Sequence, residues 1–148
     1  MEQTLCIIKP DGVKRNLVGE VISRLEKKKF AIRYLRSTVL PKPFMKKFYG
    51  HLKAKLGVKL YGIIVKYMTE GPVVVMILER PNAVKAMRAL AGPTDPSKAK
   101  KGTIRGDLAK GVVLEDCVRR MQPVRNVVHC CGNVEESKDE IKMVRALL

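Results

Sequence analysis

The sequence predicts an α+β fold in which helices cover a small sheet. Apolar runs typical of strands alternate with segments whose apolar residues recur at helical spacing. Hydrophobic residues occupy 46% of the 148 positions, so the chain can bury a substantial core. No linker, repeat or low-complexity stretch divides the sequence, and we expect one domain over residues 1–148.

Four segments are predicted to be strands. The first, residues 4–8, stops at Pro10-Asp11-Gly12, which is strong turn chemistry. Residues 30–40 form the second strand. Residues 73–78 are a continuous apolar run suited to a central strand, and residues 126–131 form the last strand.

Helices are expected in the intervening segments, namely residues 17–28, 44–55, 60–68, 82–90 and 133–148. Asn82 and Asn133 are candidate N-caps, and Glu136 completes a capping-box variant with Asn133. Residues 92–111 hold four glycines and two prolines, and they are expected to form a long functional loop. This order of elements suits a ferredoxin-like, split βαβ fold with an antiparallel four-stranded sheet.

Charge and cysteine usage narrow the classes of function. The formal net charge is +16, which favours anionic partners such as nucleotides or nucleic acid. The four cysteines form no C-x-x-C pair and complete no zinc pattern with the two histidines, so we expect free thiols in a reducing, cytoplasmic compartment. No apolar run of about eighteen residues occurs, and the first residues lack the pattern of a secretory leader, so we expect neither a membrane span nor secretion.

His129 is the first candidate for chemistry. It lies in an apolar strand segment, where a lone histidine is more often structural than catalytic. Three basic residues elsewhere in the chain favour the catalytic interpretation: Lys9 at a strand end, Arg88 on a helix and Arg105 in the glycine-rich loop. Each of them, taken singly, could be a surface cation. A P-loop is excluded because no G-x-x-x-x-G-K-[ST] motif occurs.

Four motifs in order carry a resemblance to a known family. They are KPDGVKRNLVGE at residues 9–20, GPVVVM at 71–76, GTIRGD at 102–107 and NVVH at 126–129. Together with the helix around residues 135–141, they make nearly the whole chain resemble the nucleoside diphosphate kinases. The resemblance implies that fold and a ping-pong transfer of the γ-phosphate of a nucleoside triphosphate to a nucleoside diphosphate. The phosphate would be carried on His129, because a neutral imidazole is a good covalent carrier.

The resemblance also implies roles for the neighbours of His129. Glu140 matches the carboxylate that holds the second ring nitrogen, and Tyr49 matches a tyrosine beside the histidine. The remaining matches are nucleotide-binding: the phosphate-binding cations Lys9, Arg88 and Arg105, the phosphate-binding hydroxyl of Thr94, the ribose contacts of Lys9 and Asn126, and Leu60 at the base position. Mg²⁺ is expected to be carried by the nucleotide phosphates, because no carboxylate cluster suggests a dedicated cage.

The sequence departs from the family pattern at several positions. Leu60 stands where the family stacks the base on phenylalanine, with Tyr61 beside it as an alternative platform. Cys131 replaces a hydroxyl residue near the active site, and Lys101 replaces a proline found at subunit contacts. The segment 109–125 is longer than is common and is expected to add a turn of helix or a hairpin near the mouth of the site.

Two other functions compete with the kinase. A basic nucleic-acid-binding module on a ferredoxin-like sheet fits the charge, but only 5% of the residues are aromatic and none is Trp, which leaves little for base stacking. A catalytically silent scaffold is disfavoured by the intact candidate residues. As partners we expect nucleoside tri- and diphosphates, other copies of the chain in a homo-oligomer (hexamer or tetramer), and nucleic acid through incidental binding.

Overall fold

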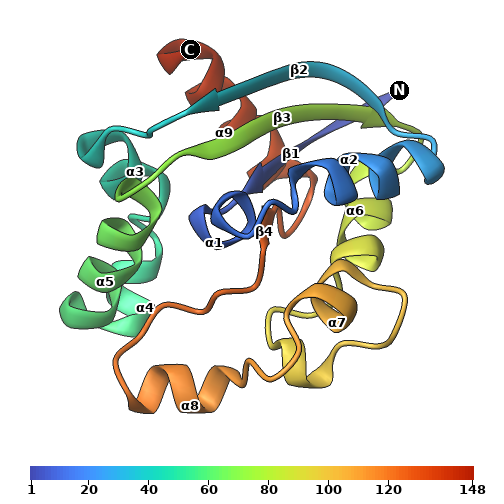
Figure 1. Cartoon of the computed structure of the whole chain (residues 1–148). Helices are drawn as coiled ribbons and strands as arrows, with labels where there is room; N and C mark the ends of the chain where they lie inside the picture. Colours follow the sequence, from blue (N-terminus) through green and yellow to red (C-terminus); the bar gives the residue numbers. More distant parts are fainter.

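The computed structural model describes all residues, 1–148, and is built on a four-stranded antiparallel sheet (Figure 1). The strands are β1 (Glu2–Ile8), β2 (Ala31–Thr38), β3 (Val73–Arg80) and β4 (Val128–Cys130). Their order across the sheet is β2-β3-β1-β4, so β1 and β3 lie in the centre. This is the order of a split βαβ sheet, and it confirms the predicted ferredoxin-like fold.

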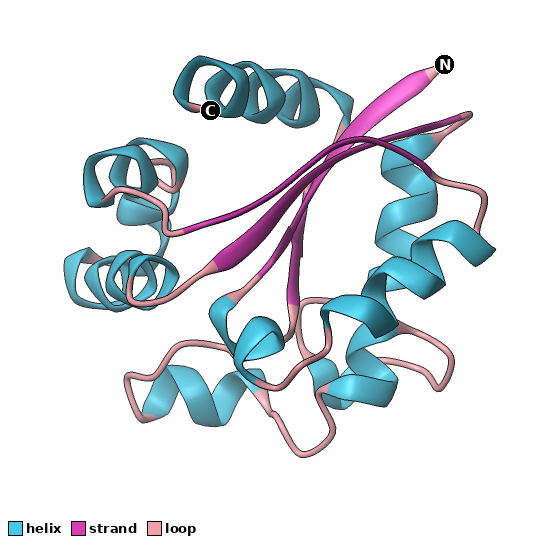
Figure 2. Cartoon of the chain, turned by 45° about the horizontal axis from the view of Figure 1, so that its top comes forward, coloured by secondary structure: helices cyan, strands magenta, loops and turns pink.

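Helices cover both faces of the sheet, as Figure 2 shows, and the central strands β1 and β3 are buried. One face of β1 carries Cys6 and Ile8, which pack against α2 (Val18–Lys27) and α6 (Ala83–Ala91). The other face carries Leu5 and Ile7, which pack against helices α3 (Lys42–Phe48), α5 (Val58–Thr69) and α9 (Val134–Leu147). Burial on both faces explains why the central strands read as continuous apolar runs.

The first turn and the helical segments at residues 44–55 differ from the expectation. Pro10 opens a short helix, α1 (Pro10–Lys14), because proline is favoured at the first helical position. The expected single helix at 44–55 is two helices, α3 and α4 (Leu52–Leu56), with a turn at residues 49–51 between them. Gly57 then ends α4 at φ 86°, a left-handed conformation that glycine adopts readily.

Asn82 does not cap α6 with its side chain, so that prediction is wrong. Its backbone is left-handed at φ 52°, which asparagine tolerates better than most residues, and its side chain makes no capping bond. A side chain of β1 binds a backbone N–H in the first turn of α6 instead: the Glu2 carboxylate accepts the Val84 N–H at 2.8 Å. The Asn133 cap is confirmed, since its Oδ1 accepts the Glu136 N–H at 2.8 Å.

The expected loop at residues 92–111 contains two short helical segments, η1 (Pro96–Lys98) and α7 (Ile104–Leu108). Thr103 caps α7 by accepting the Gly106 N–H at 3.0 Å, and a Cβ at Gly106 would lie 2.0 Å from the Lys100 carbonyl oxygen. Only glycine fits there. The segment 109–125 forms one further helix, α8 (Leu114–Arg119).

No helix in the structure has the length and apolarity needed to cross a membrane.

Candidate active site

A cleft of about 490 Å³ opens beside the end of β4. Helices α4 and α5 contribute one wall, α8 and the segment after it another, and β4 contributes the inner end. Eight of the nine residues predicted for the site line it: Lys9, Tyr49, Leu60, Arg88, Thr94, Arg105, Asn126 and His129. The ninth, Glu140, lies behind the histidine.

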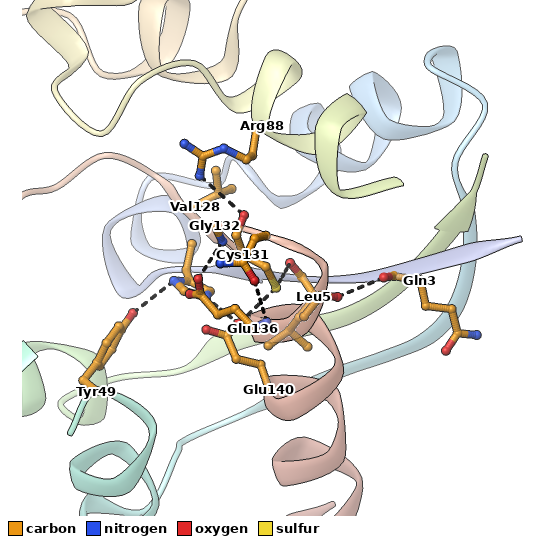
Figure 3. Close-up of polar contacts among 12 residues, drawn as sticks. Gln3, Leu5, Tyr49, Arg88, Val128, Cys131, Gly132, Glu136 and Glu140 are labelled. Carbon is orange, nitrogen blue, oxygen red and sulfur yellow. Dashed lines mark hydrogen bonds and ion pairs between the residues drawn. The ribbon is translucent and has the colours of Figure 1, made fainter. Parts of the chain in front are cut away.

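His129 is held through one ring nitrogen, which leaves the other toward the cleft. Its Nε2 lies 2.8 Å from Oε2 of Glu140, a residue of α9 that is 4% exposed (Figure 3). A carboxylate accepts a hydrogen bond from Nε2–H, which assigns the proton to Nε2 and the lone pair to Nδ1. The Tyr49 hydroxyl lies 3.5 Å from Nδ1, and the Phe48 ring meets the imidazole edge-on at 5.2 Å.

Glu140 is an anion at neutral pH. Burial acts to raise its pKa, but the hydrogen bond and charge of His129, with the Cys131 thiol, outweigh burial and lower the pKa. Cys131 Sγ donates to the same carboxylate oxygen at 3.1 Å. The replacement of a hydroxyl by this thiol therefore keeps a donor to Glu140.

The backbone before His129 is held in an unusual conformation. Val127 has φ 73°, which a β-branched residue rarely adopts. Its N–H donates to Asp11 Oδ2 at 3.0 Å, and its carbonyl accepts the Lys9 N–H at 2.8 Å. Tyr67 also donates its hydroxyl to Asp11. This conformation ends the ladder, so β4 is shorter than the predicted strand at 126–131.

Arg105 is a buried cation without an acidic partner. Its side chain is directed by carbonyl oxygens: Nη2 donates to Val128 at 2.7 Å, Nη1 to Gly92 at 2.9 Å and Nε to Asn126 at 3.3 Å. The residue is only 6% exposed, and burial lowers its pKa. An uncompensated buried charge is unfavourable unless an anion joins it.

Lys9 and Asn126 form the second polar group of the cleft. Lys9 Nζ donates to Asn126 Oδ1 at 2.8 Å and to the Val124 carbonyl at 2.9 Å. Asn126 in turn donates to the Thr94 carbonyl at 2.9 Å, which fixes its amide. Burial lowers the pKa of Lys9 to about 8, with Asp11 opposing the shift.

The charged side chains that line the cleft are all basic. No Asp or Glu is among its lining residues, and none of Lys9, Arg88 and Arg105 forms an ion pair. Arg88 reaches from α6 to the chain after β4, where its Nη1 lies 3.5 Å from the Cys131 carbonyl (Figure 3). Cations without counter-ions that share one cleft with an imidazole suit a polyphosphate.

Apolar side chains of α5 and α8 line part of the cleft. Leu60 is 7% exposed on α5, and Leu114 and Val118 of α8 also line the cleft. Tyr61 does not line it, because its side chain lies elsewhere and its hydroxyl donates to the Lys46 carbonyl at 2.7 Å. The alternative aromatic platform considered for Tyr61 is therefore wrong.

Comparison with known proteins now decides the family. The family model for nucleoside diphosphate kinase matches residues 2–146. The chain belongs to the nucleoside diphosphate kinase family. A nucleoside diphosphate kinase of Ignicoccus hospitalis is 40% identical over 143 residues, which cover 97% of this chain and 88% of that protein. Nucleoside diphosphate kinase 1 of Glycine max is 41% identical over 142 residues, 96% of this chain and 86% of that protein.

Solved structures of the same family share the fold. A nucleoside-diphosphate kinase of Borrelia burgdorferi, solved as a transition-state mimic with bound vanadate and ADP, has a TM-score of 0.90 at 28% identity, with 96% of this chain and 85% of that chain covered. The enzyme from Pyrobaculum aerophilum has a TM-score of 0.86 at 32% identity and covers 96% and 94% of the two chains.

Sequence reasoning missed Asp11, Val127 and Tyr67. Asp11 stood in a Pro-Asp-Gly segment that indicates a turn, and nothing local reveals that its carboxylate reaches a residue far along the chain. A buried aspartate has to find donors, but burial cannot be read from an isolated Asp in a turn motif.

Proposed function

We propose that the chain transfers the γ-phosphate of a nucleoside triphosphate to a nucleoside diphosphate in a ping-pong reaction through a phosphohistidine at His129. The observation that carries this proposal is the imidazole whose Nε2 is bonded to Glu140 and which lines the same cleft as three unpaired cations, Lys9, Arg88 and Arg105. Such an arrangement offers one nucleophilic nitrogen and a place for a moving, negatively charged group.

The first half-reaction begins when the triphosphate enters the cleft. Lys9, Arg88 and Arg105 bind its phosphate oxygens, and each cation contributes on the order of 4 kcal/mol at about 4 Å and an effective dielectric near 20. The Nδ1 lone pair attacks the γ-phosphorus, the N–P bond forms, and the bond to the β-phosphate oxygen breaks. The electron pair of that bond leaves with the diphosphate.

Glu140 and Tyr49 support the histidine in this step. The positive charge that develops on the ring is stabilised by the anionic Glu140 through the Nε2–H bond. The Tyr49 hydroxyl, 3.5 Å from Nδ1, bounds the position that the phosphoryl group takes. A second nucleoside diphosphate then takes the phosphate by the reverse reaction.

The nucleoside occupies the outer cleft in this proposal. Lys9 and Asn126 lie where ribose hydroxyls are expected, and Thr94 offers its hydroxyl to a phosphate. The base contacts Leu60 on one side and the apolar residues of α8, Leu114 and Val118, on the other. Without an aromatic platform the base is held by dispersion and burial alone.

Mg²⁺ fits this cleft only as a companion of the nucleotide. Mg²⁺ prefers oxygen ligands such as carboxylates and phosphates, and no acidic side chain lines the cleft. The phosphates themselves would therefore hold the ion, where it neutralises part of their charge. The protein's own cations act on the remaining oxygens.

We further propose a homo-oligomer in the cytoplasm. The edge strand β2 has no partner on its outer side, and Leu35 on it and Val39 after it are 47% and 56% exposed. Pairing through this edge would cover them, in a tetramer or a hexamer. The four free thiols, Cys6, Cys117, Cys130 and Cys131, suit a reducing compartment.

Nucleic-acid binding is an incidental property in this account. The net charge of +16 supports salt-sensitive contact with phosphate backbones. Both faces of the sheet are covered by helices, so the sheet offers no open surface for base stacking.

Incubation with γ-labelled ATP tests the proposal. We expect an acid-labile, base-stable label that is absent from His129→Ala and is discharged by GDP. A label that survives in His129→Ala, or that GDP does not remove, would overturn it. Lys138→Ala, a change at an exposed residue of α9, is the matched control and should label like the parent protein.

A further inference from the structure

Three metal-binding atoms of different chemistry meet behind the cleft. They are a ring nitrogen of His129, Sγ of Cys131 and a carboxylate oxygen of Glu140, and all lie within 4.8 Å of one another. They come from β4, the chain just after it and α9, and Figure 3 shows Cys131 and Glu140 facing each other there. Cys131 is 1% exposed, so the thiol is shielded from bulk water.

The hydrogen bonding of Glu140 leaves room for a positive ion. Oε2 accepts from both His129 Nε2, at 2.8 Å, and Cys131 Sγ, at 3.1 Å. Oε1 of the same carboxylate is buried and has no hydrogen-bond partner. A cation among the three residues would replace two shared hydrogens and give the unpartnered oxygen a counter-charge.

The separations suit a tetrahedral ion. Zinc binds thiolate, imidazole and carboxylate at roughly 2.0–2.3 Å, which places neighbouring ligands about 3.3–3.8 Å apart. The two contacts to Oε2 are 2.8 and 3.1 Å, so each has to widen by about half an ångström. The His129 nitrogen and Cys131 Sγ, which lie within 4.8 Å of each other, have to come to the same range. Water could supply the fourth ligand.

We propose that His129, Cys131 and Glu140 form a binding site for a thiophilic divalent cation of the zinc class, and that its occupancy blocks the nucleophile. On binding, the Cys131 thiol releases its proton to water and a metal–sulfur bond forms. The His129 proton moves from Nε2 to Nδ1, and Nε2 binds the ion. Nδ1 then has no lone pair with which to attack phosphorus.

The site discriminates between two classes of cation. Thiolate and imidazole ligands favour zinc-class ions, whereas Mg²⁺ prefers an all-oxygen environment. The cation that accompanies the nucleotide phosphates and the cation that blocks His129 therefore occupy different places. Free Mg²⁺ should not compete for the Cys131 site.

The blocking part of the inference rests on the proposed phosphohistidine. When Nδ1 carries phosphate and Nε2 keeps its proton, the ring is an imidazolium whose charge is stabilised by Glu140. An ion could then bind Nε2 only after that proton is lost to water, because Nδ1 is no longer free to take it. Phosphorylation should therefore protect the protein from the cation, and the cation should protect His129 from phosphorylation.

Cobalt substitution tests the site without nucleotide or turnover. Co²⁺ is added to the nucleotide-free protein, and the near-ultraviolet cobalt–thiolate absorption is recorded. We expect the band in the parent chain, in Cys130→Ser and in Cys117→Ser, and its absence in Cys131→Ser. Zn²⁺ should abolish the band, and excess Mg²⁺ should leave it. Cys130 is the sharpest control, because it is the adjacent residue and lines the cleft.

Three results would overturn the site: no band in the parent chain, a band that persists in Cys131→Ser, or a band that disappears in Cys130→Ser. Glu140→Gln supplies a second variant, which should weaken Co²⁺ affinity at least tenfold, because changing a residue that only hydrogen-bonds to a metal ligand already costs about 10- to 100-fold. Unchanged affinity in Glu140→Gln would also contradict the proposal.

Labelling with γ-labelled ATP at increasing Zn²⁺ tests the blocking. The Zn²⁺ concentration that halves labelling should rise at least tenfold in Cys131→Ser relative to Cys130→Ser, and equal values would refute it. Failure of the phosphohistidine would appear as no label even without Zn²⁺, while the cobalt band would remain. Failure of the metal site would appear as labelling without the band.

Discussion

The Asp11 carboxylate fixes the backbone of Val127, whose N–H donates to Asp11 Oδ2 at 3.0 Å. Val127 is left-handed at φ 73°, and it lies two residues before His129. A strained residue persists only where its surroundings hold it. The contact therefore links the segment just after β1 to the backbone that positions the His129 imidazole.

Asp11→Ala should affect both the stability of the fold and the position of His129. The buried Val127 N–H would lose its acceptor, which we expect to lower the free energy of unfolding by roughly 1–3 kcal/mol. Relaxation of Val127 should displace His129 and lower kcat. Chemical denaturation and steady-state kinetics measure the two effects.

Tyr67→Phe is the control for that change. It removes the hydroxyl that donates to the Asp11 carboxylate and accepts the Asp11 N–H, but it leaves the bond that the Val127 N–H donates to Asp11. It should reduce kcat less than Asp11→Ala does. Asp11→Ala with parental kcat would show that the imidazole does not depend on this contact.

The lowered pKa of Lys9 should make nucleotide affinity depend on pH. Its pKa is lowered to about 8, so the free enzyme loses this cation as the pH rises through that value. The KM for a nucleoside diphosphate should then increase above about pH 8, while Lys9→Arg, which stays charged, should lack this inflection. KM measured across this range in both proteins decides the point, and a parallel rise in Lys9→Arg would rule out Lys9 as the cause.

The same shift has an opposite consequence for folding. Lys9 loses its proton near pH 8 in the folded chain and near the ordinary value of 10.5 in the unfolded chain. Between these values the unfolded chain binds more protons, so this group makes the folded state more stable as the pH rises. The contribution should be absent from Lys9→Met in denaturation experiments.

Glu140→Gln should impair chemistry more than binding. The amide has no charge with which to stabilise the developing imidazolium, so we expect kcat to fall about 10- to 100-fold, as for other partners that orient a functional histidine. Nucleotide KM should stay within about twofold because Glu140 lies behind the cleft. Glu135→Gln, at an exposed position of the same helix, should be silent. A rise in KM with parental kcat would contradict the positioning role.

Leu60→Phe should restore an aromatic platform for the base. Stacking on an aromatic side chain contributes roughly 1–3 kcal/mol per base, so the KM for purine nucleotides should fall several-fold. Tyr61→Phe, which removes only the hydroxyl bonded to Lys46, should leave KM unchanged. A series of nucleotides with different bases would test this, and identical KM values in Leu60→Phe and the parent would place the base elsewhere.

The sequence indicated the fold well because its strands are strongly patterned. The run at 73–78 is apolar throughout since β3 is buried on both faces, and that pattern is visible without coordinates. The ends of the helices and strands were harder to predict from the sequence. The division of α3 from α4 depends on a turn at residues 49–51, and the end of the β4 ladder depends on Val127, whose conformation is imposed by Asp11.

The motifs predicted the residues that line the site but not the contacts that hold these residues in place. His129, Lys9 and Arg105 stand in segments with a recognisable pattern, and all three line the cleft. The thiol of Cys131 bonds to Glu140 across a turn, and such a contact depends on where α9 packs against β1. Local sequence does not encode that placement.

The ring nitrogen of His129 that carries the phosphate is the sharpest test of the phosphohistidine mechanism. Protein with ¹⁵N-labelled histidine is phosphorylated with a nucleoside triphosphate, and nitrogen–phosphorus coupling is measured by NMR. We expect coupling to Nδ1 of His129, because Nε2 is bound to Glu140. Coupling to Nε2, or to a nitrogen of His51, would contradict it.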